Sequence, residues 1–315
     1  MYIMDRLCEL VSERGHVCVG LDTSPDYIPP LSRRLAVSDA EAVLAFNKAI
    51  IDATSDKVAC FKVQVAYYEA LGRAGLDVYA KTLAVIREKK ALVIADIKRG
   101  DIADTALQYA KAHFEGDFEA DFVTLSPYMG MDSIEPWLAY AESRGKGAFI
   151  LMKTSNKGMS DFQNLEVHNY PNNLCASASL REELPRVYQV VGDKLTIIAE
   201  QHMGKYGYGA FGAVVGADPK TGEERVETAA LRERYSKLFF LIPGYGAQGG
   251  AAEDAALLLR EGNGGVVNAS RSILKAWTEK SANNDGKETD NAFAAEAAGE
   301  AVVTMRNAIW KAAGK

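Results

Sequence analysis

Residues 91–102 read Ala-Leu-Val-Ile-Ala-Asp-Ile-Lys-Arg-Gly-Asp-Ile, an apolar run that ends in a dense group of charges. Five successive apolar residues favour a strand that is buried on both faces, as the strands of parallel sheets are. Successive strand residues point to opposite sides, so Asp96 and Lys98 should share one side and Ile97 should face the other. The stretch therefore predicts a buried parallel strand that carries a carboxylate and an ammonium at its carboxyl end.

Similar runs recur along the chain and are separated by segments with helical periodicity. Residues 40–54, 78–89 and 105–114 each place apolar side chains on one helix face. This alternation predicts parallel βαβ units, and eight repeats favour a closed barrel over an open doubly wound sheet. The expected fold class is α/β, a single (β/α)8 TIM barrel. The other seven expected strands are residues 16–21, 58–63, 122–126, 147–153, 212–216, 238–242 and 265–268.

One barrel domain is expected to span residues 1–315, because such a barrel typically needs about 250 residues plus insertions. Residues 157–184 are rich in Asn, Ser, Gly and Pro, which predicts an insertion loop after the fifth strand. Residues 195–200 resemble a strand, but a strand there would break the alternation. We therefore expect them to end a helix that begins near residue 183.

The composition narrows the range of functions. A net charge of −6 and a pI near 5.4 argue against broad binding to nucleic acids or anionic membranes. No stretch approaches the ~18 uncharged apolar residues that cross a bilayer, and the first ten residues lack a secretion-signal pattern. The four cysteines are scattered, without the spacing of a disulfide framework or a zinc site. We expect a cytoplasmic protein with no nucleic-acid partner, no membrane contact and no metal.

Charges also occur at the first two expected strands, since Asp22 follows the first and Lys62 interrupts the second. Such charges are costly to bury unless they are paired, and the carboxyl end of a barrel carries the active site. Each opposite pair at ~4 Å would gain about 4 kcal/mol at an effective dielectric constant of about 20, which would keep Lys98 charged despite burial. The alternative is an ion pair that only caps the strand. The expected cluster comprises Lys62, Asp96, Lys98 and Asp101.

A glycine-rich segment, residues 244–250, follows the seventh expected strand and precedes a helix expected to begin near Ala251. Free N–H groups at a helix N-terminus favour an anion, and the loops after strands seven and eight form the usual phosphate site of barrels. Arg271 follows the eighth strand and adds a cation, with a short helix expected over residues 272–278. The alternative is a tight turn for close helix packing, but the added cation favours a phosphate site.

Taken together, these motifs resemble those of orotidine 5'-phosphate decarboxylases. The Asp-x-Lys-x-x-Asp-Ile run at 96–102 is similar to the signature of that family, and further motifs follow in the family's order. The form of residues 96–105, the Lys-Thr-Ser-Asn segment and the long insertions resemble the second subfamily. The further motifs are Gly-Leu-Asp at 20–22, Phe-Lys-Val-Gln at 61–64, Thr-Ser-Asn at 154–156, PGYGAQGG at 243–250 and ASRSI at 269–273.

The resemblance implies an enzyme that converts orotidine 5'-monophosphate to UMP and CO2, the last step of UMP biosynthesis, without a cofactor. It implies that Lys98 protonates C6 and that Asp96 lies beside the substrate carboxylate. It also implies a homodimer in which Asp101, a catalytic residue, and Thr105, a ribose-binding residue, reach across the interface. The other implied substrate-binding residues are Asp22 and Lys62 at the ribose, Ser155 and Asn156 near the pyrimidine, and Gln248, Gly249 and Arg271 near the 5'-phosphate; Lys62 is also implied in catalysis.

Two other functions share parts of this pattern. A sugar-phosphate enzyme resembling 3-keto-gulonate-6-phosphate decarboxylase or hexulose-phosphate synthase would need Mg²⁺ and a carboxylate on the second strand. The sequence offers Lys62 there, and the nearest carboxylate, Glu69, is already in the next segment. A non-catalytic nucleotide-binding barrel would bind UMP without turnover, and the complete set of charged residues argues against it.

Overall fold

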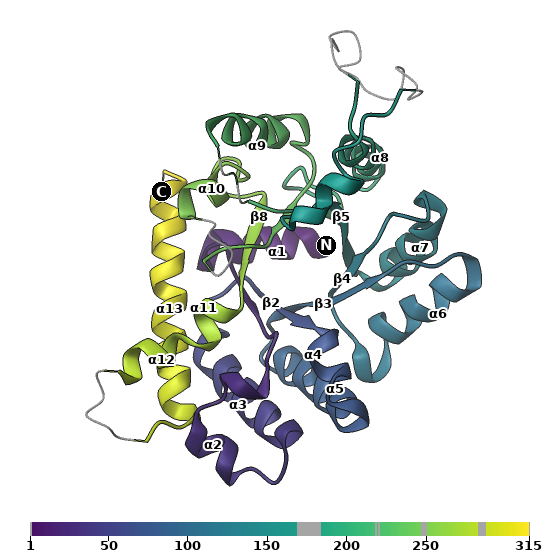
Figure 1. The fold of residues 1–315 in the computed structure, drawn as a ribbon. Coiled ribbons are helices and arrows are strands. Elements are labelled where there is room, and N and C mark those ends of the chain that lie inside the picture. The colour runs from purple at the N-terminus through teal and green to yellow at the C-terminus, as the bar shows by residue number, and fades with distance from the viewer. Residues whose placement is uncertain are drawn as a thin grey trace.

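The computed structural model describes residues 2–168, 184–217, 219, 221–246, 251–282 and 288–314. The strands are β1 (Val17–Gly20), β2 (Cys60–Gln64), β3 (Leu92–Arg99), β4 (Phe122–Leu125), β5 (Gly147–Lys153), β6 (Phe211–Val215), β7 (Phe240–Ile242) and β8 (Gly265–Ala269). They pair in parallel in chain order and close into a barrel, with β1 next to β8 (Figure 1). The (β/α)8 barrel is confirmed, and the open sheet is excluded because β1 and β8 are not free edges.

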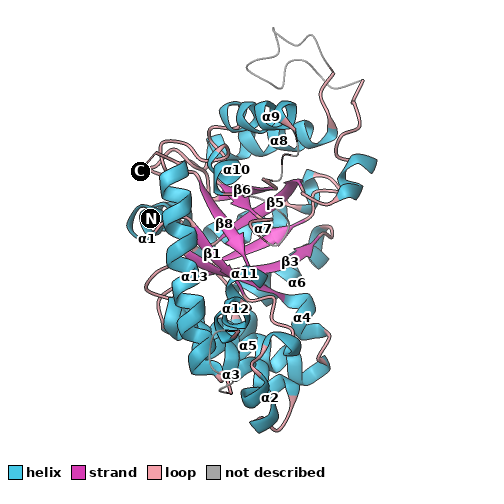
Figure 2. Cartoon of the chain, turned by 60° about the vertical axis from the view of Figure 1, so that its left-hand side comes forward, coloured by secondary structure: helices cyan, strands magenta, loops and turns pink. Residues whose placement is uncertain are grey.

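Helices surround the strands on the outside of the barrel (Figure 2). Most of them connect one strand to the next, as parallel pairing requires. In chain order they are α1 (Ile3–Arg14), α2 (Pro30–Leu35), α3 (Asp39–Thr54), α4 (Val65–Glu69), α5 (Gly72–Glu88), α6 (Ala103–Phe114), α7 (Glu135–Arg144), α8 (Val187–Gln201), α9 (Gly222–Arg234), α10 (Ala252–Ala256), α11 (Arg271–Leu274), α12 (Ala276–Ser281) and α13 (Asn291–Ala312).

Local sequence explains where several helices begin. Ser38 caps α3 by accepting a hydrogen bond from the backbone N–H of Glu41, and Thr221 and Glu224 form a capping box at α9. Residues 195–200 lie within α8, which confirms that they are helical. The expected single helix over residues 272–278 is wrong, because α11 ends at Leu274 and α12 begins at Ala276.

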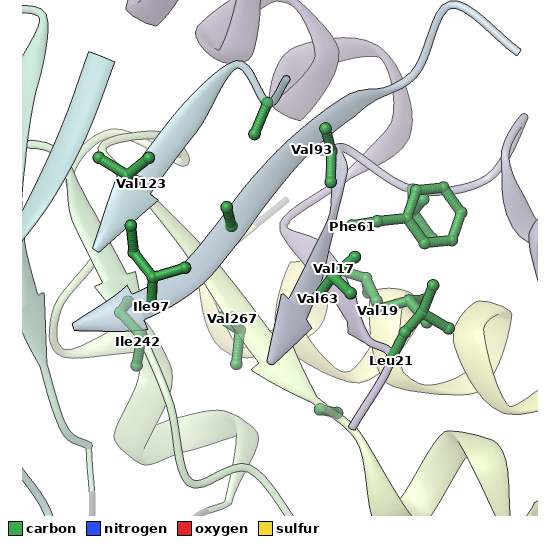
Figure 3. Packing of buried hydrophobic residues seen from close by; sticks show 14 of the residues in the cluster. Val17, Val19, Leu21, Phe61, Val63, Val93, Ile97, Val123, Ile242 and Val267 are labelled. Carbon is green, nitrogen blue, oxygen red and sulfur yellow. The ribbon is translucent and has the colours of Figure 1, made fainter. Parts of the chain in front are cut away.

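Side chains alternate between two apolar layers along the strands, as their period of two requires. Val17 and Val19 belong to the large cluster between the strands and the surrounding helices, part of which Figure 3 shows. Cys18, between them, belongs to a second cluster inside the barrel, together with Phe122 and Phe149. The helix α1, directly before β1, contributes to this inner cluster and so covers the amino ends of the strands. The opposite, carboxyl end of the barrel is left for polar side chains.

The last helix of the chain packs on the outside of the barrel and contacts β1. The last helix, α13, packs along α3 and also contacts α10, α11 and α12 (Figure 1). None of the described helices combines the length and the apolar character that crossing a bilayer requires.

Candidate active site

Four charged side chains form a continuous line at the carboxyl ends of β1, β2 and β3. Lys62 Nζ lies 3.0 Å from Asp22 Oδ1 and 2.9 Å from Asp96 Oδ2. Lys98 Nζ lies 2.6 Å from the other oxygen of Asp96, Oδ1. The line Asp22–Lys62–Asp96–Lys98, called the charge cluster below, alternates in sign throughout, so each charge is stabilised by a neighbour of the opposite sign.

Burial and pairing decide the charge state of the two central residues. The side chains of Lys62 and Asp96 are only 6% and 8% exposed. Burial by itself would lower the pKa of Lys62, but Asp22 and Asp96 outweigh it and raise that pKa above the usual lysine value. Burial would likewise raise the pKa of Asp96, but Lys62 and then Lys98 outweigh it and hold that pKa below the usual range. Both groups are therefore ionised at neutral pH.

Three neutral side chains complete the hydrogen bonding of the charge cluster, and none of them was among the expected site residues, although Gln64 and Ser270 lie in motifs at 61–64 and 269–273. Gln64 Nε2 donates to Asp96 Oδ2 at 3.0 Å, and Thr124 Oγ1 donates to Asp96 Oδ1 at 2.8 Å. Ser270 Oγ donates to Asp22 Oδ2 at 2.9 Å. The signal for Gln64 was available, because it lies two residues after Lys62 on the same strand. Thr124 and Ser270 come from β4 and the end of β8, and only the barrel brings them here.

The backbone departs from regular strand geometry at Lys98. The register between β3 and β4 shifts between Ala95 and Arg99, and Lys98 has a φ of 45°. A positive φ is uncommon for a residue with a side chain and is typical of bulges and functional sites. The expectation that Lys98 is buried is wrong, because its side chain is 46% exposed while that of Asp96 remains buried. The irregularity thus leaves the ammonium open to the mouth of the barrel.

Asp101 and Thr105 do not join the charge cluster within one chain. The Asp101 carboxylate accepts a hydrogen bond from the backbone N–H of Ile102 at 2.9 Å and makes no ion pair with any described residue. Thr105 lies exposed in the first turn of α6. The fourth member of the cluster is instead Asp22, and among the described residues no hydrogen bond or ion pair joins Asp101 or Thr105 to it.

Ser155 and Asn156 follow β5 at the same end of the barrel. The exposed Asn156 accepts a hydrogen bond from Thr154 Oγ1 through its side-chain oxygen at 2.7 Å. The end of β6 packs closely against Ser155, since a Cβ added at Gly216 would lie 2.8 Å from that of Ser155. A larger residue at position 216 would therefore displace Ser155.

The expected phosphate region is only partly described, because Gln248 and Gly249 lie outside the described residues. Arg271 is exposed at the start of α11 and lines a cavity of about 600 Å³ between the β7 and β8 loops and α13. Tyr245, Gly246 and Lys275 line the same cavity. Two cations, Arg271 and Lys275, and one carboxylate, Glu279, thus border this space.

Among the residues that the structure describes, no group of three or more His, Cys, Asp or Glu side chains is placed to hold a metal ion. Glu69, the carboxylate that a magnesium-dependent relative would need near Asp96, pairs with Arg99 at 3.3 Å. The position beside Asp96 is taken by the ammonium of Lys62, which would repel a divalent cation.

Comparison with known protein families shows to which family the chain belongs. The orotidine 5'-phosphate decarboxylase / HUMPS family matches residues 15–284. The chain belongs to this family. Members of the orotidine 5'-phosphate decarboxylase group also match along nearly the full length. An orotidine 5'-phosphate decarboxylase of Clostridium perfringens is 50% identical over 310 residues, which cover 98% of this chain and 99% of that protein.

Further members agree with this assignment. An orotidine 5'-phosphate decarboxylase of Clostridium tetani is 47% identical over 310 residues, 98% of each chain. The solved structure of the Leishmania donovani OMP decarboxylase superposes with a TM-score of 0.68 at 29% identity, covering 98% of this chain and all of that one. The family, the barrel and the decarboxylase relatives expected from the motifs are thus confirmed.

Proposed function

We propose that the chain decarboxylates orotidine 5'-monophosphate to UMP and CO2, as a cytoplasmic carboxy-lyase in UMP biosynthesis. The observation that carries this proposal is the pairing of a buried, ionised Asp96 with the exposed ammonium of Lys98. The pair presents a negative and a positive group side by side at the mouth of the barrel. This is the arrangement that a reaction losing a carboxylate and gaining a proton at one carbon requires.

The reaction breaks the bond between C6 of the pyrimidine and its carboxylate carbon. The electron pair of that bond stays on C6 while CO2 leaves. The ammonium of Lys98 stabilises the developing negative charge and then donates a proton to C6, so that Lys98 becomes a neutral amine and is reprotonated from water. Because the group is oriented before the reaction, it stabilises charge without reorganisation at the moment of bond cleavage.

Asp96 acts on the ground state of the bound substrate. Its carboxylate is held in place by Lys62, Gln64 and Thr124, so it cannot turn away from a second carboxylate. Repulsion between the two negative groups is relieved as CO2 departs. The energy that holds the substrate there comes from contacts with parts of the nucleotide that do not react.

We assign the non-reacting parts of the nucleotide to the remaining expected residues. Asp22 and Lys62 would bind the ribose, and Ser155 with Asn156 would bind the pyrimidine. The phosphate would be bound by Arg271 in the cavity near Gly246, together with Gln248 and Gly249. A guanidinium suits a phosphate because it offers paired N–H donors.

We also propose that the whole chain is one barrel domain that works as a homodimer, with Asp101 and Thr105 completing the partner's site. Exposed apolar side chains support this, because several of them lie in the segments after β3, β4 and β5, and Asp101 and Thr105 lie in the first of these segments. The ring centroids of two of them, Tyr128 and Phe162, lie 6.5 Å apart. The exposed apolar residues are Ile102 (48%), Tyr128 (85%), Met129 (49%) and Phe162 (63%).

The test is a UV absorbance assay with orotidine 5'-monophosphate, run with and without EDTA. We expect conversion to UMP that is insensitive to the chelator, because Lys62 occupies the place of a metal-binding carboxylate. Absence of conversion by folded protein would point to the sugar-phosphate group of the same family, which sugar phosphates with Mg²⁺ would then test. Folded protein that binds UMP without converting the substrate would refute the proposed activity.

A further inference from the structure

Thr124, near the end of β4, lies next to the part of β3 that carries Asp96 and Lys98. Its hydroxyl donates to Asp96 Oδ1 at 2.8 Å. The same oxygen accepts hydrogen bonds from the backbone N–H groups of Ile97 and Lys98, both at 3.0 Å. Thr124 is 1% exposed, so no solvent competes for these bonds.

The three bonds use the full capacity of the hydroxyl, which has one proton and two acceptor lone pairs. They also complete the hydrogen bonding of Asp96. Its Oδ1 accepts from Thr124 and Lys98, and its Oδ2 accepts from Lys62 and Gln64. A carboxylate has about four acceptor positions, so the side chain of Asp96 has no freedom to rotate.

The hydroxyl also holds the backbone where β3 is irregular. Regular pairing between β3 and β4 is interrupted between Ala95 and Arg99, so the N–H groups of this interval cannot all find backbone carbonyls on β4. Thr124 supplies a side-chain acceptor in place of the missing backbone partner for two of them. One of these N–H groups belongs to Lys98, whose φ of 45° needs such support from its surroundings.

We propose that Thr124 is a positioning residue that sets both charges of the reacting pair, Asp96 through its carboxylate and Lys98 through its backbone. One hydroxyl group thereby fixes the distance and direction between the repelling carboxylate and the proton donor. The kinetic part of this inference rests on the proposed decarboxylation, whereas the structural part does not.

The experiment compares three substitutions. Thr124→Val keeps the shape and removes the hydroxyl, and Thr124→Ser keeps the hydroxyl and removes a methyl group. Thr54→Val is the matched control, since Thr54 is also a fully buried threonine whose hydroxyl bonds a backbone carbonyl, that of Ile50 in α3. Steady-state decarboxylation by each protein is measured together with its thermal unfolding midpoint.

We expect Thr124→Val to lower kcat by about 10- to 100-fold, since a small misplacement of reacting groups costs this much. Its KM should change by less than about threefold, because the groups that bind the ribose and phosphate are untouched. Thr124→Ser and Thr54→Val should keep the wild-type kcat. Wild-type kcat in Thr124→Val, or an equal loss in Thr124→Ser, would overturn the proposal. If the valine variant does not fold, Thr124→Ala makes the same comparison.

A second readout needs no substrate. In protein labelled with ¹⁵N-lysine, the backbone N–H of Lys98 is identified as the signal lost in Lys98→Arg. We expect its hydrogen exchange to speed up by about tenfold or more in Thr124→Val and to remain unchanged in Thr124→Ser. Unchanged exchange in Thr124→Val would refute the positioning role. Absence of turnover by the wild-type protein would instead refute the proposed function and leave this measurement to decide the role of Thr124.

Discussion

Lys98 Nζ lies 2.6 Å from Asp96 Oδ1, although the two residues are separated by a single residue on β3. Side chains two apart on a strand share a side, but they run parallel and away from the sheet in a regular strand. Here the positive φ of Lys98 accompanies a short contact between the two charges. The other oxygen of Asp96 is held by Lys62, so the carboxylate is fixed from both sides.

Lys98→Ala removes the proton donor without touching the residues expected at the ribose and phosphate. We expect kcat to fall by at least about 1,000-fold, in the upper part of the range for loss of a positioned acid. UMP binding, measured by titration calorimetry, should remain detectable. Lys81→Ala, which changes an exposed lysine of α5 paired with Asp77, is the control and should keep full activity. Near-normal turnover by Lys98→Ala would exclude the mechanism.

Lys62→Met leaves two carboxylates, Asp22 and Asp96, without the cation between them. Removing one partner of a buried ion pair costs about 3–5 kcal/mol, and Asp96 would keep Lys98 as its one remaining cation. We expect a loss of this size in the free energy of unfolding, measured with urea. Lys81→Met should change it by less than about 0.5 kcal/mol, since its ion pair is exposed. A cost for Lys62→Met as small as that of the control would show that water compensates the two carboxylates.

Arg271→Ala should act mainly on substrate binding. Loss of a hydrogen-bonded charge to the phosphate should raise KM by about tenfold or more. The difference should nearly vanish with orotidine, which has no phosphate, and this comparison serves as the internal control. A variant with a lower kcat and an unchanged KM would mean that Arg271 helps to position the reacting groups and does not bind the phosphate.

The shared site of the proposed dimer can be tested by mixing two inactive variants. Lys98→Ala and Asp101→Ala subunits, unfolded together and refolded, should recover about a quarter of the wild-type activity, because half of the dimers carry one complete site of two. Lys98→Ala mixed with Asp96→Asn is the control and should recover nothing, since both residues belong to one chain's cluster. Failure of the first mixture to recover activity would show that Asp101 serves its own chain.

His113 should make the stability of the barrel depend on pH. Burial, and to a lesser degree the charge of Arg99, lower the pKa of His113 to about 4. Since an unfolded histidine has a pKa of about 6.5, the unfolded state binds a proton first as the pH falls. The contribution is therefore fully present above pH ~6.5 and is lost as the pH falls toward about 4, by up to about 3 kcal/mol.

The measurement is urea unfolding at a series of pH values for the wild type and His113→Phe. The difference between the two proteins should grow in favour of the variant as the pH falls from about 6.5 to 4. The aromatic replacement can keep the stacking of residue 113 on Phe118. Parallel pH profiles for the two proteins would contradict the prediction.

Much of the barrel fold could be predicted from the amino-acid sequence. The apolar runs predicted all eight strands within a few residues, and the alternation rule correctly made residues 195–200 helical. The error at Lys98, expected to be buried, arose because strand periodicity contains no information about a register shift. The family-like motifs predicted roles for Asp22, Lys62, Asp96 and Lys98, but not for the neutral side chains around them, Gln64, Thr124 and Ser270.

The sequence by itself determined the strand–helix alternation, the family and three of the four charges of the cluster, Lys62, Asp96 and Lys98, because the period of burial and the positions of charges are local properties of the chain. Only the tertiary structure decided that Lys62 bridges Asp22 and Asp96 and that Thr124 and Ser270 complete the hydrogen bonding. The physical reason is that these contacts join different strands. Their distances depend on the stagger of the closed barrel and on the bulge in β3, which no local pattern specifies.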